Sequence, residues 1–429
     1  MKFENSLSFA KSLDAQDELR SYRQHFHIPK HQKKDCIYFC GNSLGLQPKN
    51  TEEFIRKELE DWRTFGVEAH FEARKPWFPY HEFLRDDLAK LVGAKPKEVV
   101  AMNSLTLNLH LMLVSFYRPS GKRRKIIMEY SPFPSDRYAL ASHLKWHGFD
   151  PKKDLIELKP DNGSYHVSTE KIISCIQTHK NELALVMMGA VNYYTGQYFE
   201  LEKISKAAHE AGAIAGFDLA HAAGNKEMFL HKWGVDFAVW CSYKYLNAGP
   251  GSVAAAFVHE KHLNDKNLFR FAGWWGNDPK TRFTMPDDFI PVASADAWQL
   301  SNAPVLSMAA LCASMKYFSE TGMKILQKKS TLMTAYLEYT IRHVFDAVQL
   351  NQIYQIITPS DPKQRGCQLS VIVSKNGKKV FESLCDQGVM ADWRSPDVIR
   401  MAPVPLYNSF EDIYRFGQAL QKALKQHVQ

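Results

Sequence analysis

Short runs of apolar residues alternate with helical patterns through the middle of the chain, and this alternation is the strongest constraint on its fold. Leu201–Ala211 has the spacing of an amphipathic helix and is followed by Gly212, a residue type common just past a helix end. Strands that are apolar on both faces and separated by helices indicate a mostly parallel sheet covered on both sides. We therefore expect an α/β fold whose strands are Lys125–Glu129, Leu183–Met188, Ala213–Asp218, Asp236–Ser242 and Ser252–Val258.

The last third of the chain has a different pattern, which predicts a smaller α+β unit. Ser409 and Asp412 form a candidate capping box for a final helix that runs to about Leu424. The elements expected before it are long helices at Val305–Glu320 and Lys324–Val344, a strand at Gln368–Ser374, a helix at Lys378–Gln387 and a strand at Val398–Ala402.

The boundary between these parts is expected at Asn302-Ala303-Pro304. Proline disfavours helix in the residue before it and suits the first turn of a helix that follows. A chain of 429 residues is long enough for two or three structural units. We predict an N-terminal segment (residues 1–45), a large ligand-binding domain (46–302) and a small C-terminal domain (303–429).

The net charge of +8 arises from 54 basic and 46 acidic side chains. Its densest cluster is Lys122-Arg123-Arg124-Lys125, directly before the apolar run Ile126-Ile127-Met128. Nucleic-acid binding requires a larger basic face together with a recognition motif. The cluster is therefore interpreted as a solvated loop that leads into a strand, and we expect no nucleic-acid partner.

Seven cysteines are scattered along the chain without a CxxC pair, which is typical of a protein in a reducing compartment. Residues 1–20 lack the apolar stretch of a signal peptide. The longest largely apolar run, Leu183–Val191, is too short to span a bilayer. We expect a cytoplasmic protein without a membrane partner.

Reactive side chains follow three of the predicted strands. Asp218 ends one apolar run, Lys244 follows another, and the turn Tyr130–Asp136 follows a third. Ligands of open α/β sheets bind beyond the carboxyl ends of the strands. A lysine and a carboxylate there suit pyridoxal phosphate, which needs an amine for its Schiff base and a carboxylate to keep its ring nitrogen protonated.

The phosphate of that cofactor needs the free amide donors of a helix N-terminus. Asn103-Ser104-Leu105-Thr106 precedes the helical run Leu107–Phe116 and contains suitable capping residues. Each signal also has a structural alternative, since Asp218 can cap the following segment and Lys244 can be a surface lysine. The combination of the three points to the cofactor more specifically than any one of them.

Two other kinds of site find less support. His143 and His147 have the helical spacing of metal ligands, but no HExxH motif or third ligand accompanies them, so no metal is expected. The glycine-bearing turn Asn247–Gly251 follows Lys244, yet the sequence contains no complete P-loop or GxGxxG fingerprint. A nucleotide-binding function is therefore not favoured.

With these residues the sequence resembles the kynureninases, a family of fold-type I pyridoxal-phosphate enzymes. The matching motifs follow one another in order over most of the chain. They are YFCGNSLGLQP at residues 38–48, His70 with RKPW at 74–77, FPSD at 133–136, YTGQ at 194–197, DLAH at 218–221, SYKY at 242–245, GWWG at 273–276, LSN at 300–302 and RMAPVPLYN at 400–408.

The resemblance implies a fold-type I large domain that binds pyridoxal phosphate, joined to a smaller α+β C-terminal domain. It implies hydrolysis of L-kynurenine to anthranilate and L-alanine, with 3-hydroxy-L-kynurenine as the related substrate that gives 3-hydroxyanthranilate. This reaction belongs to tryptophan catabolism on the kynurenine pathway, which feeds NAD biosynthesis. The resemblance also implies a homodimer with active sites near the subunit interface, and the sequence leaves open which site residues come from the partner.

Carried over by motif, Lys244 holds the cofactor, Asp218 pairs with the ring nitrogen and Phe133 lies against the ring face. Gly189 stands where family members can carry a serine near the cofactor, so no side-chain contact is expected from it. The residues implied near the polar edge of the ring are His221 and Asp136.

The resemblance also implies contacts at the phosphate end of the cofactor. Leu105 and Thr106 meet the phosphate through backbone and hydroxyl groups, and they are joined there by Tyr243. Trp274 and Asn302 match further family contacts to cofactor or substrate.

Arg400 is the best candidate for binding the carboxylate of an amino-acid substrate, because a guanidinium can grip it with two hydrogen bonds. The alternative is a structural ion pair, for which Asp397 is the nearest acid. By resemblance, His70 and Asn302 face the aryl ketone of the substrate, and Ser43 assists them.

As a mechanism, Lys244 would take the Cα proton of the substrate, and water would add to the γ-carbonyl before the Cβ–Cγ bond breaks. Tyr243 is the candidate acid/base for the later steps, with phosphate binding as its alternative role.

The nearest rival functions are those of an aminotransferase or a cysteine desulfurase of the same fold type. A desulfurase needs a reactive cysteine, and no cysteine has an evident low-pKa setting. A silent scaffold is disfavoured by the intact set of Asp218, Lys244 and Arg400.

Overall fold

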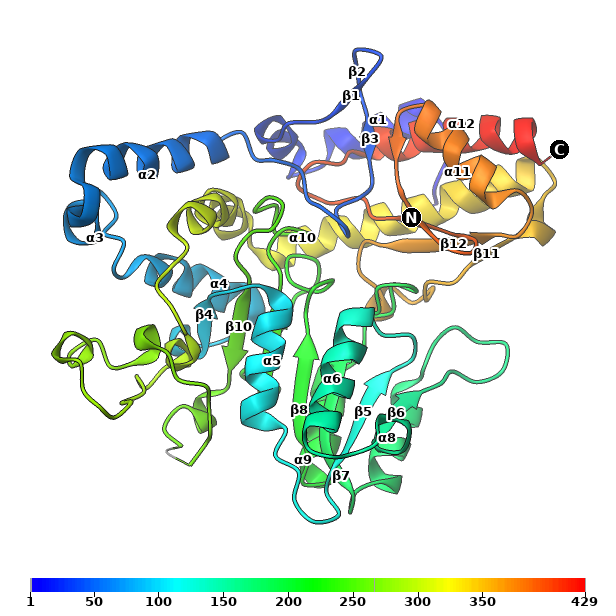
Figure 1. Cartoon of the computed structure of the whole chain (residues 1–429). Coiled ribbons are helices and arrows are strands. Elements are labelled where there is room, and N and C mark those ends of the chain that lie inside the picture. The colour runs from blue at the N-terminus through cyan, green and yellow to red at the C-terminus, as the bar shows by residue number, and fades with distance from the viewer. Residues whose placement is uncertain (1, 266, 429) are drawn as a thin grey trace.

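The computed structural model describes residues 2–265 and 267–428 and is built around a seven-stranded sheet (Figure 1). Strand β10 is antiparallel to both of its neighbours, β4 and β9, whereas the pairs from β9 through β8, β7 and β5 to β6 are all parallel. The sheet is therefore mostly parallel, as expected. The strands in spatial order are β4 (Val99–Ala101), β10 (Ala255–Val258), β9 (Phe237–Trp240), β8 (Ile214–Asp218), β7 (Leu183–Gly189), β5 (Lys125–Glu129) and β6 (Leu155–Leu158).

Helices bury both faces of this sheet, which explains why its strands are apolar on both sides. Along β5, Ile126 and Met128 belong to a core cluster with residues of α5 (Leu105–Phe116) and α6 (Pro134–Trp146). Ile127 belongs to the cluster on the other face. Helices α4 (Arg85–Val92), α8 (Thr169–Thr178) and α9 (Leu201–Glu210) contribute to that second cluster.

Two predicted strands are shorter than expected at the edge of the sheet that faces the second unit. The strand predicted at Asp236–Ser242 is β9, which ends at Trp240, and the strand predicted at Ser252–Val258 is β10, which begins at Ala255. The reason is local, because the Ser242 hydroxyl bonds the Ser252 hydroxyl at 2.7 Å in place of ladder pairing. The chain is thereby free to leave the sheet where Lys244 follows.

Two predictions about the residues that precede helices α5 and α6 are wrong. The helical run predicted from Leu107 begins at Leu105, and Ser104 precedes it without a side-chain capping bond. The predicted turn Tyr130–Asp136 is shorter, because Pro134 starts α6 and places Asp136 in its first turn.

The basic cluster Lys122–Lys125 was predicted to be a solvated loop, but most of its side chains bind neighbouring parts of the protein at the amino-terminal end of β5. Lys122 is exposed, but the Arg123 guanidinium donates to the carbonyl oxygens of Leu183 and Ala211. Arg124 and Lys125 form ion pairs with Asp154 and Glu182. These side chains tie the start of β5 to its neighbours.

The second unit packs a four-stranded antiparallel sheet against helices, close to the predicted pattern. Helix α10 (Val305–Ala347) has non-helical backbone at Gly322, between the two predicted helices. The capping box of Ser409 and Asp412 is present at the start of α12 (Phe410–His427). The other elements, with the strands in spatial order, are β11 (Tyr354–Ile356), β12 (Leu369–Val373), β15 (Val398–Met401), β14 (Asp392–Arg394) and helix α11 (Gly377–Asp386).

The N-terminal residues pack on this second unit, as Figure 1 shows for the blue segment beside the orange and red ones. Strand β3 (Ile37–Tyr38) pairs in parallel with β13 (Val389–Met390). In the described residues, no helix combines the length and apolar character needed to cross a bilayer. The remaining elements are α1 (Leu7–Ala15), β1 (Lys30–His31), β2 (Lys34–Asp35), α2 (Thr51–Phe65), α3 (Ala69–Glu72) and α7 (Pro151–Asp154).

Candidate active site

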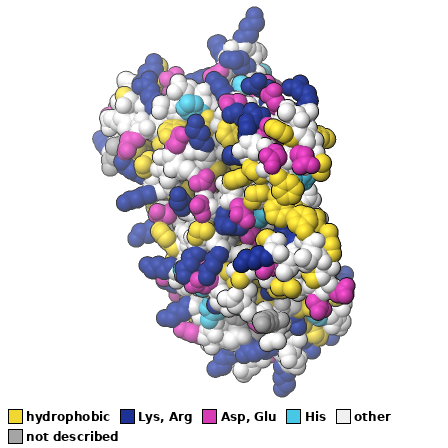
Figure 2. Space-filling model, turned by 90° about the vertical axis from the view of Figure 1, so that its left-hand side faces the viewer, with side chains coloured by type: hydrophobic (Ala, Val, Ile, Leu, Met, Phe, Trp, Pro, Cys, Tyr) yellow, Lys and Arg dark blue, Asp and Glu magenta, His cyan; other side chains and the backbone are white. Residues whose placement is uncertain are grey.

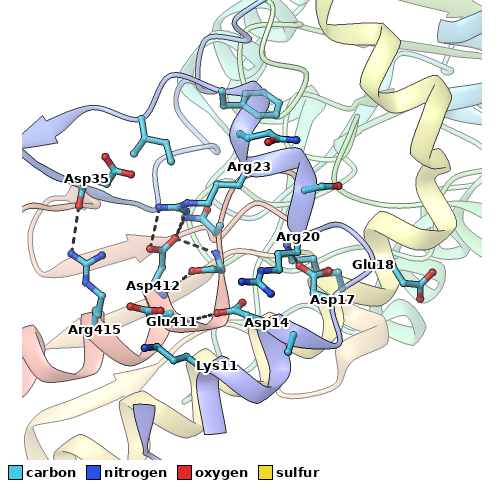
Figure 3. A pocket seen from close by; sticks show the side chains of 18 of the residues that line it. Lys11, Asp14, Asp17, Glu18, Arg20, Arg23, Asp35, Glu411, Asp412 and Arg415 are labelled. Atoms are coloured by element: carbon cyan, nitrogen blue, oxygen red, sulfur yellow. Dashed lines mark hydrogen bonds and ion pairs between the residues drawn. The ribbon is translucent and has the colours of Figure 1, made fainter. Parts of the chain in front are cut away.

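A wide charged groove lies between the N-terminal segment and the start of α12 (Figure 3). Its charges largely satisfy one another. Arg23 pairs with Asp412 at 2.7 Å, and both carboxylate oxygens of Asp14 accept backbone N–H groups at the start of α12. None of the residues predicted to bind cofactor or substrate lines this groove. The groove is therefore a structural contact between the N-terminal segment and the C-terminal helix.

The predicted cofactor residues gather instead around a smaller cavity of about 150 Å³ at the carboxyl ends of β5, β7 and β8. These three strands end in Glu129, Gly189 and Asp218, and all three residues line the cavity. The predicted cofactor residues that line the cavity are Leu105, Thr106, Phe133, Asp136, Asp218, His221, Tyr243 and Lys244.

Lys244 lies in the loop after β9 and points across the cavity. Its Nζ is 3.0 Å from Nε2 of His221 and 5.7 Å from the centre of the Phe133 ring. Burial, reinforced by the positive charge of Lys244, holds the pKa of His221 well below its usual value. The imidazole is therefore neutral, and its buried Nδ1 has no hydrogen-bond partner.

Asp218 and Asp136 form a buried pair of carboxyl groups on the wall of the cavity. Burial raises the pKa of both, and the Asp218 carboxylate beside it raises the pKa of Asp136 further. The positive charge of Lys244 and the N–H of Ala220, 2.6 Å from Oδ1, favour the ionised form of Asp218. Asp136 therefore carries the shared proton and donates it to Asp218, which is the anion of the pair.

Glu129 is a third buried carboxyl on this wall, and it is not among the site residues predicted from the sequence. It is 4% exposed. Burial raises the pKa of Glu129 to about 7, and hydrogen bonds from the backbone N–H groups of Glu129 and Gly189 oppose the rise. The signal in the sequence that could have identified Glu129 is a charged residue at the end of an otherwise apolar run.

The N-terminus of α5 forms the other end of the cavity. The first N–H groups of a helix have no partner inside the helix, and they lie here at Leu105 and Thr106, which both line the cavity. Tyr243 lines the same cavity, and burial raises the pKa of its hydroxyl, which keeps its proton. This end thus offers hydrogen-bond donors suited to a phosphate.

Arg400, on β15 of the second sheet, reaches the cavity through Tyr193. Its Nη1 donates to the Tyr193 carbonyl at 2.6 Å, and its Nη2 binds Asp392 and, at 3.3 Å, the Ser43 hydroxyl. The proposed alternative partner, Asp397, was wrong, because Asp392 is the acid directly opposite Arg400 in the sheet. Arg400 is 1% exposed, and its Nε has no hydrogen-bond partner.

Besides Arg400 and Ser43, three further predicted site residues lie outside the cavity, namely His70, Trp274 and Asn302. The His70 ring nitrogen Nδ1 bonds the Val67 carbonyl, and Trp274 donates its indole N–H to the Arg282 carbonyl. Trp274 and Asn302 are both exposed. Within one chain these residues do not meet Lys244.

The residues that do meet fit pyridoxal phosphate. The cavity combines an amine, a buried carboxylate, an aromatic ring and a helix N-terminus at its far end. Two buried nitrogen atoms, His221 Nδ1 and Arg400 Nε, lack any partner in the described residues. Buried polar groups rarely stay unpaired, so these atoms indicate that further polar groups bind here.

Comparisons of sequence agree with this site. Residues 326–420 match the family described as "Kynureninase C-terminal domain". A kynureninase from Flavobacterium psychrophilum is 50% identical over 424 residues, which cover 99% of each chain. One from Myxococcus xanthus is 51% identical over 420 residues, covering 98% of this chain and 97% of the relative. One from Nematostella vectensis is 48% identical, covering 98% and 94%.

Solved structures agree with the fold. An apo cysteine desulfurase from Thermococcus onnurineus NA1 superposes with a TM-score of 0.74 and 18% identity, covering 91% of this chain and 95% of that one. A cysteine desulfurase from Escherichia coli has a TM-score of 0.76 and 15% identity, covering 96% and 99%. The expected fold class is confirmed. Identity near one half over almost the whole length shows that the chain belongs to the kynureninase family.

Proposed function

We propose that this protein hydrolyses L-kynurenine, and also 3-hydroxy-L-kynurenine, with pyridoxal phosphate as cofactor. The observation that carries the proposal is the shared cavity of Lys244 and Asp218, beside which the buried Arg400 binds the carbonyl of the cavity residue Tyr193 through Nη1 and keeps an unpartnered Nε. When bound, the cofactor supplies an electron-withdrawing ring that stabilises negative charge at the substrate Cα.

Each residue has a role that follows from its position. Lys244 would hold the cofactor, Asp218 would pair with its ring nitrogen and Phe133 would lie against the ring, since all three line the cavity. Leu105 and Thr106 would bind the phosphate through the start of α5. His221 and Asp136 would bond the polar edge of the ring, which would give the buried Nδ1 of His221 a partner.

Arg400 would orient the substrate by binding its carboxylate through the unpartnered Nε and through Nη2, whose bonds to Asp392 and Ser43 the carboxylate would replace. This two-bond geometry would fix the Cα beside Lys244. Lys244 is the base that removes the Cα proton and the acid that returns a proton to the alanine fragment. Water adds to the γ-carbonyl carbon, and the Cβ–Cγ bond then breaks. The oxygen of that water ends in the carboxylate of anthranilate, and Cβ gains a proton to give L-alanine.

Tyr243 had two candidate roles, and its surroundings favour one of them. Because burial raises the pKa of its hydroxyl, the phenol holds its proton across the physiological range. A neutral phenol donates a hydrogen bond well and accepts a proton poorly. The raised pKa also makes the phenol a poor proton donor, so we assign Tyr243 to phosphate binding as a hydrogen-bond donor.

Exposed apolar side chains gather on the face of the molecule shown in Figure 2, and aromatic contacts join the neighbourhoods of His70 and Trp274, two of the residues missing from the cavity. Phe71, next to His70, stacks on Phe78, and Phe78 stacks on Phe283, which contacts Trp274. Contiguous exposed aromatic side chains are typical of an interface. We propose that a second copy covers this face, and that His70, Trp274 and Asn302 complete the active site of the partner.

The rival functions of the same fold find less support. Burial raises the pKa of the thiol in all seven cysteines, whereas a desulfurase depends on a thiolate. All seven are also unpaired, which supports a reducing compartment such as the cytoplasm. By its family the enzyme would act in tryptophan catabolism.

The test is to load the purified protein with pyridoxal phosphate and supply each kynurenine separately, while measuring both products. Equal amounts of the anthranilate-type product and of alanine are expected. Transfer of the amino group to a keto acid, without anthranilate, would favour an aminotransferase. Absence of both products, despite a lysine-bound cofactor in the absorption spectrum, would overturn the substrate.

A further inference from the structure

Glu129 is a buried acid at the centre of the site to which the proposed chemistry assigns no task. It is the last residue of β5, between β6 and β7, and it lines the same cavity as Asp218 and Lys244. In the part of the chain that the structure describes, no basic side chain lies within ion-pair distance of Glu129. A carboxylate buried without a cation is strongly destabilised, so the structure needs a reason to keep this group.

A side chain at the end of the neighbouring strand, at Gly189, would have to displace the carboxyl of Glu129. A Cβ placed on Gly189 would lie 2.8 Å from Oε1 of Glu129, closer than any normal contact. The next atom, the Val191 carbonyl oxygen, is 3.5 Å away and leaves ordinary room. Glu129 therefore occupies the space above β7 that a side chain at position 189 would fill.

The charges around Glu129 favour its neutral form. Asp218 on β8 and Asp136 on α6 are acids of the same cavity, and Glu157 on β6 adds another negative charge. Glu157 is already bound by Arg137 and by the Ser131 N–H.

The only cation that the cavity offers against three carboxyl groups is Lys244, and His221 is neutral. Ionisation of Glu129 would place a second anion beside Asp218 without a balancing charge.

We propose that Glu129 is a further positioning residue of the cofactor site and acts in its protonated form. It fills the part of the cavity wall over Gly189, and it would leave Asp218 as the single anion available to pair with the ring nitrogen. This inference rests on the proposed binding of pyridoxal phosphate. It adds a residue that holds its neighbours in place rather than one that reacts.

The experiment measures the Kd of the apo protein for pyridoxal phosphate at pH 6 and pH 8.5, together with the visible absorbance of the bound cofactor. The variants are Glu129→Gln, which is neutral at both pH values and keeps the shape, Glu129→Ala, which empties the space, and Gly189→Ser, which displaces the carboxyl. Glu182→Gln is the matched control, because Glu182 pairs with Lys125 at the opposite end of β5.

At pH 6, Glu129→Gln should bind within about three-fold of the wild type, whereas Glu129→Ala and Gly189→Ser should bind at least about ten-fold more weakly. Between pH 6 and 8.5, the ratio of the wild-type Kd to that of Glu129→Gln should change by about three-fold or more, because only the wild type can ionise there. The control should follow the wild type at both pH values.

Glu129→Gln as weak as Glu129→Ala at pH 6 would show that the site needs the anion, and would overturn the proposal. Glu129→Ala as tight as the wild type, or a Kd ratio that stays constant with pH, would overturn it as well. If Glu129→Ala does not fold, Glu129→Gln and Gly189→Ser still decide. A wild type that fails to bind pyridoxal phosphate would instead refute the proposed function, so the two failures are distinct.

Discussion

The Nζ of Lys244 lies 3.0 Å from Nε2 of His221, a histidine kept neutral by its burial and by the cations around it. A neutral imidazole can accept a hydrogen bond from the lysine, and this bond holds Nζ over the cavity. The two residues come from loops after adjacent strands, β8 and β9. We propose that this contact positions Lys244 for covalent attachment of the cofactor.

Replacing Lys244 with alanine should remove the lysine-bound absorption band and lower turnover by at least about a thousand-fold, because the attachment point and the base are lost together. Lys232→Ala, at an exposed lysine, is the control and should leave both unchanged. Spectra and product assays decide. Normal turnover by the Lys244→Ala protein would refute the mechanism.

Replacing Arg400 with lysine should raise the KM for L-kynurenine by at least about ten-fold, because the ammonium cannot form the two-bond grip on the carboxylate. The Kd for pyridoxal phosphate should stay within about two-fold, because Arg400 lies beyond Tyr193 rather than on the cavity wall. Arg20→Lys, in the exposed groove, serves as control. An unchanged KM would show that Arg400 has only a structural role, as the ion-pair partner of Asp392.

Mixing two inactive chains should restore activity if each active site uses both subunits. Chains with Lys244→Ala lack the attachment point, and chains with Asn302→Ala lack a residue of the exposed face. A hybrid dimer then contains one complete site, so an equal mixture should reach about a quarter of wild-type activity. The mixture should be compared with each variant alone. Activity no higher than the average of the two would place Asn302 in the site of its own chain.

Replacing Asp14 with alanine should lower the free energy of unfolding by about 1 to 2 kcal/mol, because two N–H groups at the start of α12 lose their acceptor. Glu18→Ala is the matched control, since Glu18 forms only an exposed ion pair with Lys328 and should change stability little. Urea unfolding of the apo protein measures both. Equal midpoints for the two variants would contradict the capping role.

The stability of the apo protein should fall relative to that of Glu129→Gln as the pH rises from 4.5 to 7. Burial raises the pKa of Glu129 to about 7 from an ordinary value of 4.5. In that window the unfolded chain has released a proton that the folded chain keeps, so folding becomes less favourable with rising pH. The difference should approach about 3 kcal/mol above pH 7. Thermal unfolding across this range measures it, and parallel curves for the two proteins would contradict it.

Much of the fold was predictable because its signals are local. Strand β5 has the predicted bounds, and the non-helical Gly322 falls between the two predicted helices. The orientation of β10 was not predictable, because an apolar run of residues reads the same whether its strand is parallel or antiparallel. The domain boundaries at residues 45 and 302 stay predictions.

The candidate site was predictable where residue type and strand end coincide, as at Asp218 and Lys244. The partner of Arg400 was not, because Asp392 faces it only through the register of β14 and β15, which proximity along the chain does not reveal. Glu129 was missed for a related reason. A glutamate at the end of an apolar strand resembles a surface residue until the helices that bury it are in place.

The contact between Asp14 and the start of α12 joins residues 396 positions apart, which affects how the protein is made. A ribosome that adds roughly 5 to 20 residues per second needs about 20 to 80 s to synthesise the stretch between them. During that time α1 and β3 have left the ribosome while α12 and β13, on which they pack, do not yet exist. The first elements to be synthesised are therefore among the last to find their place.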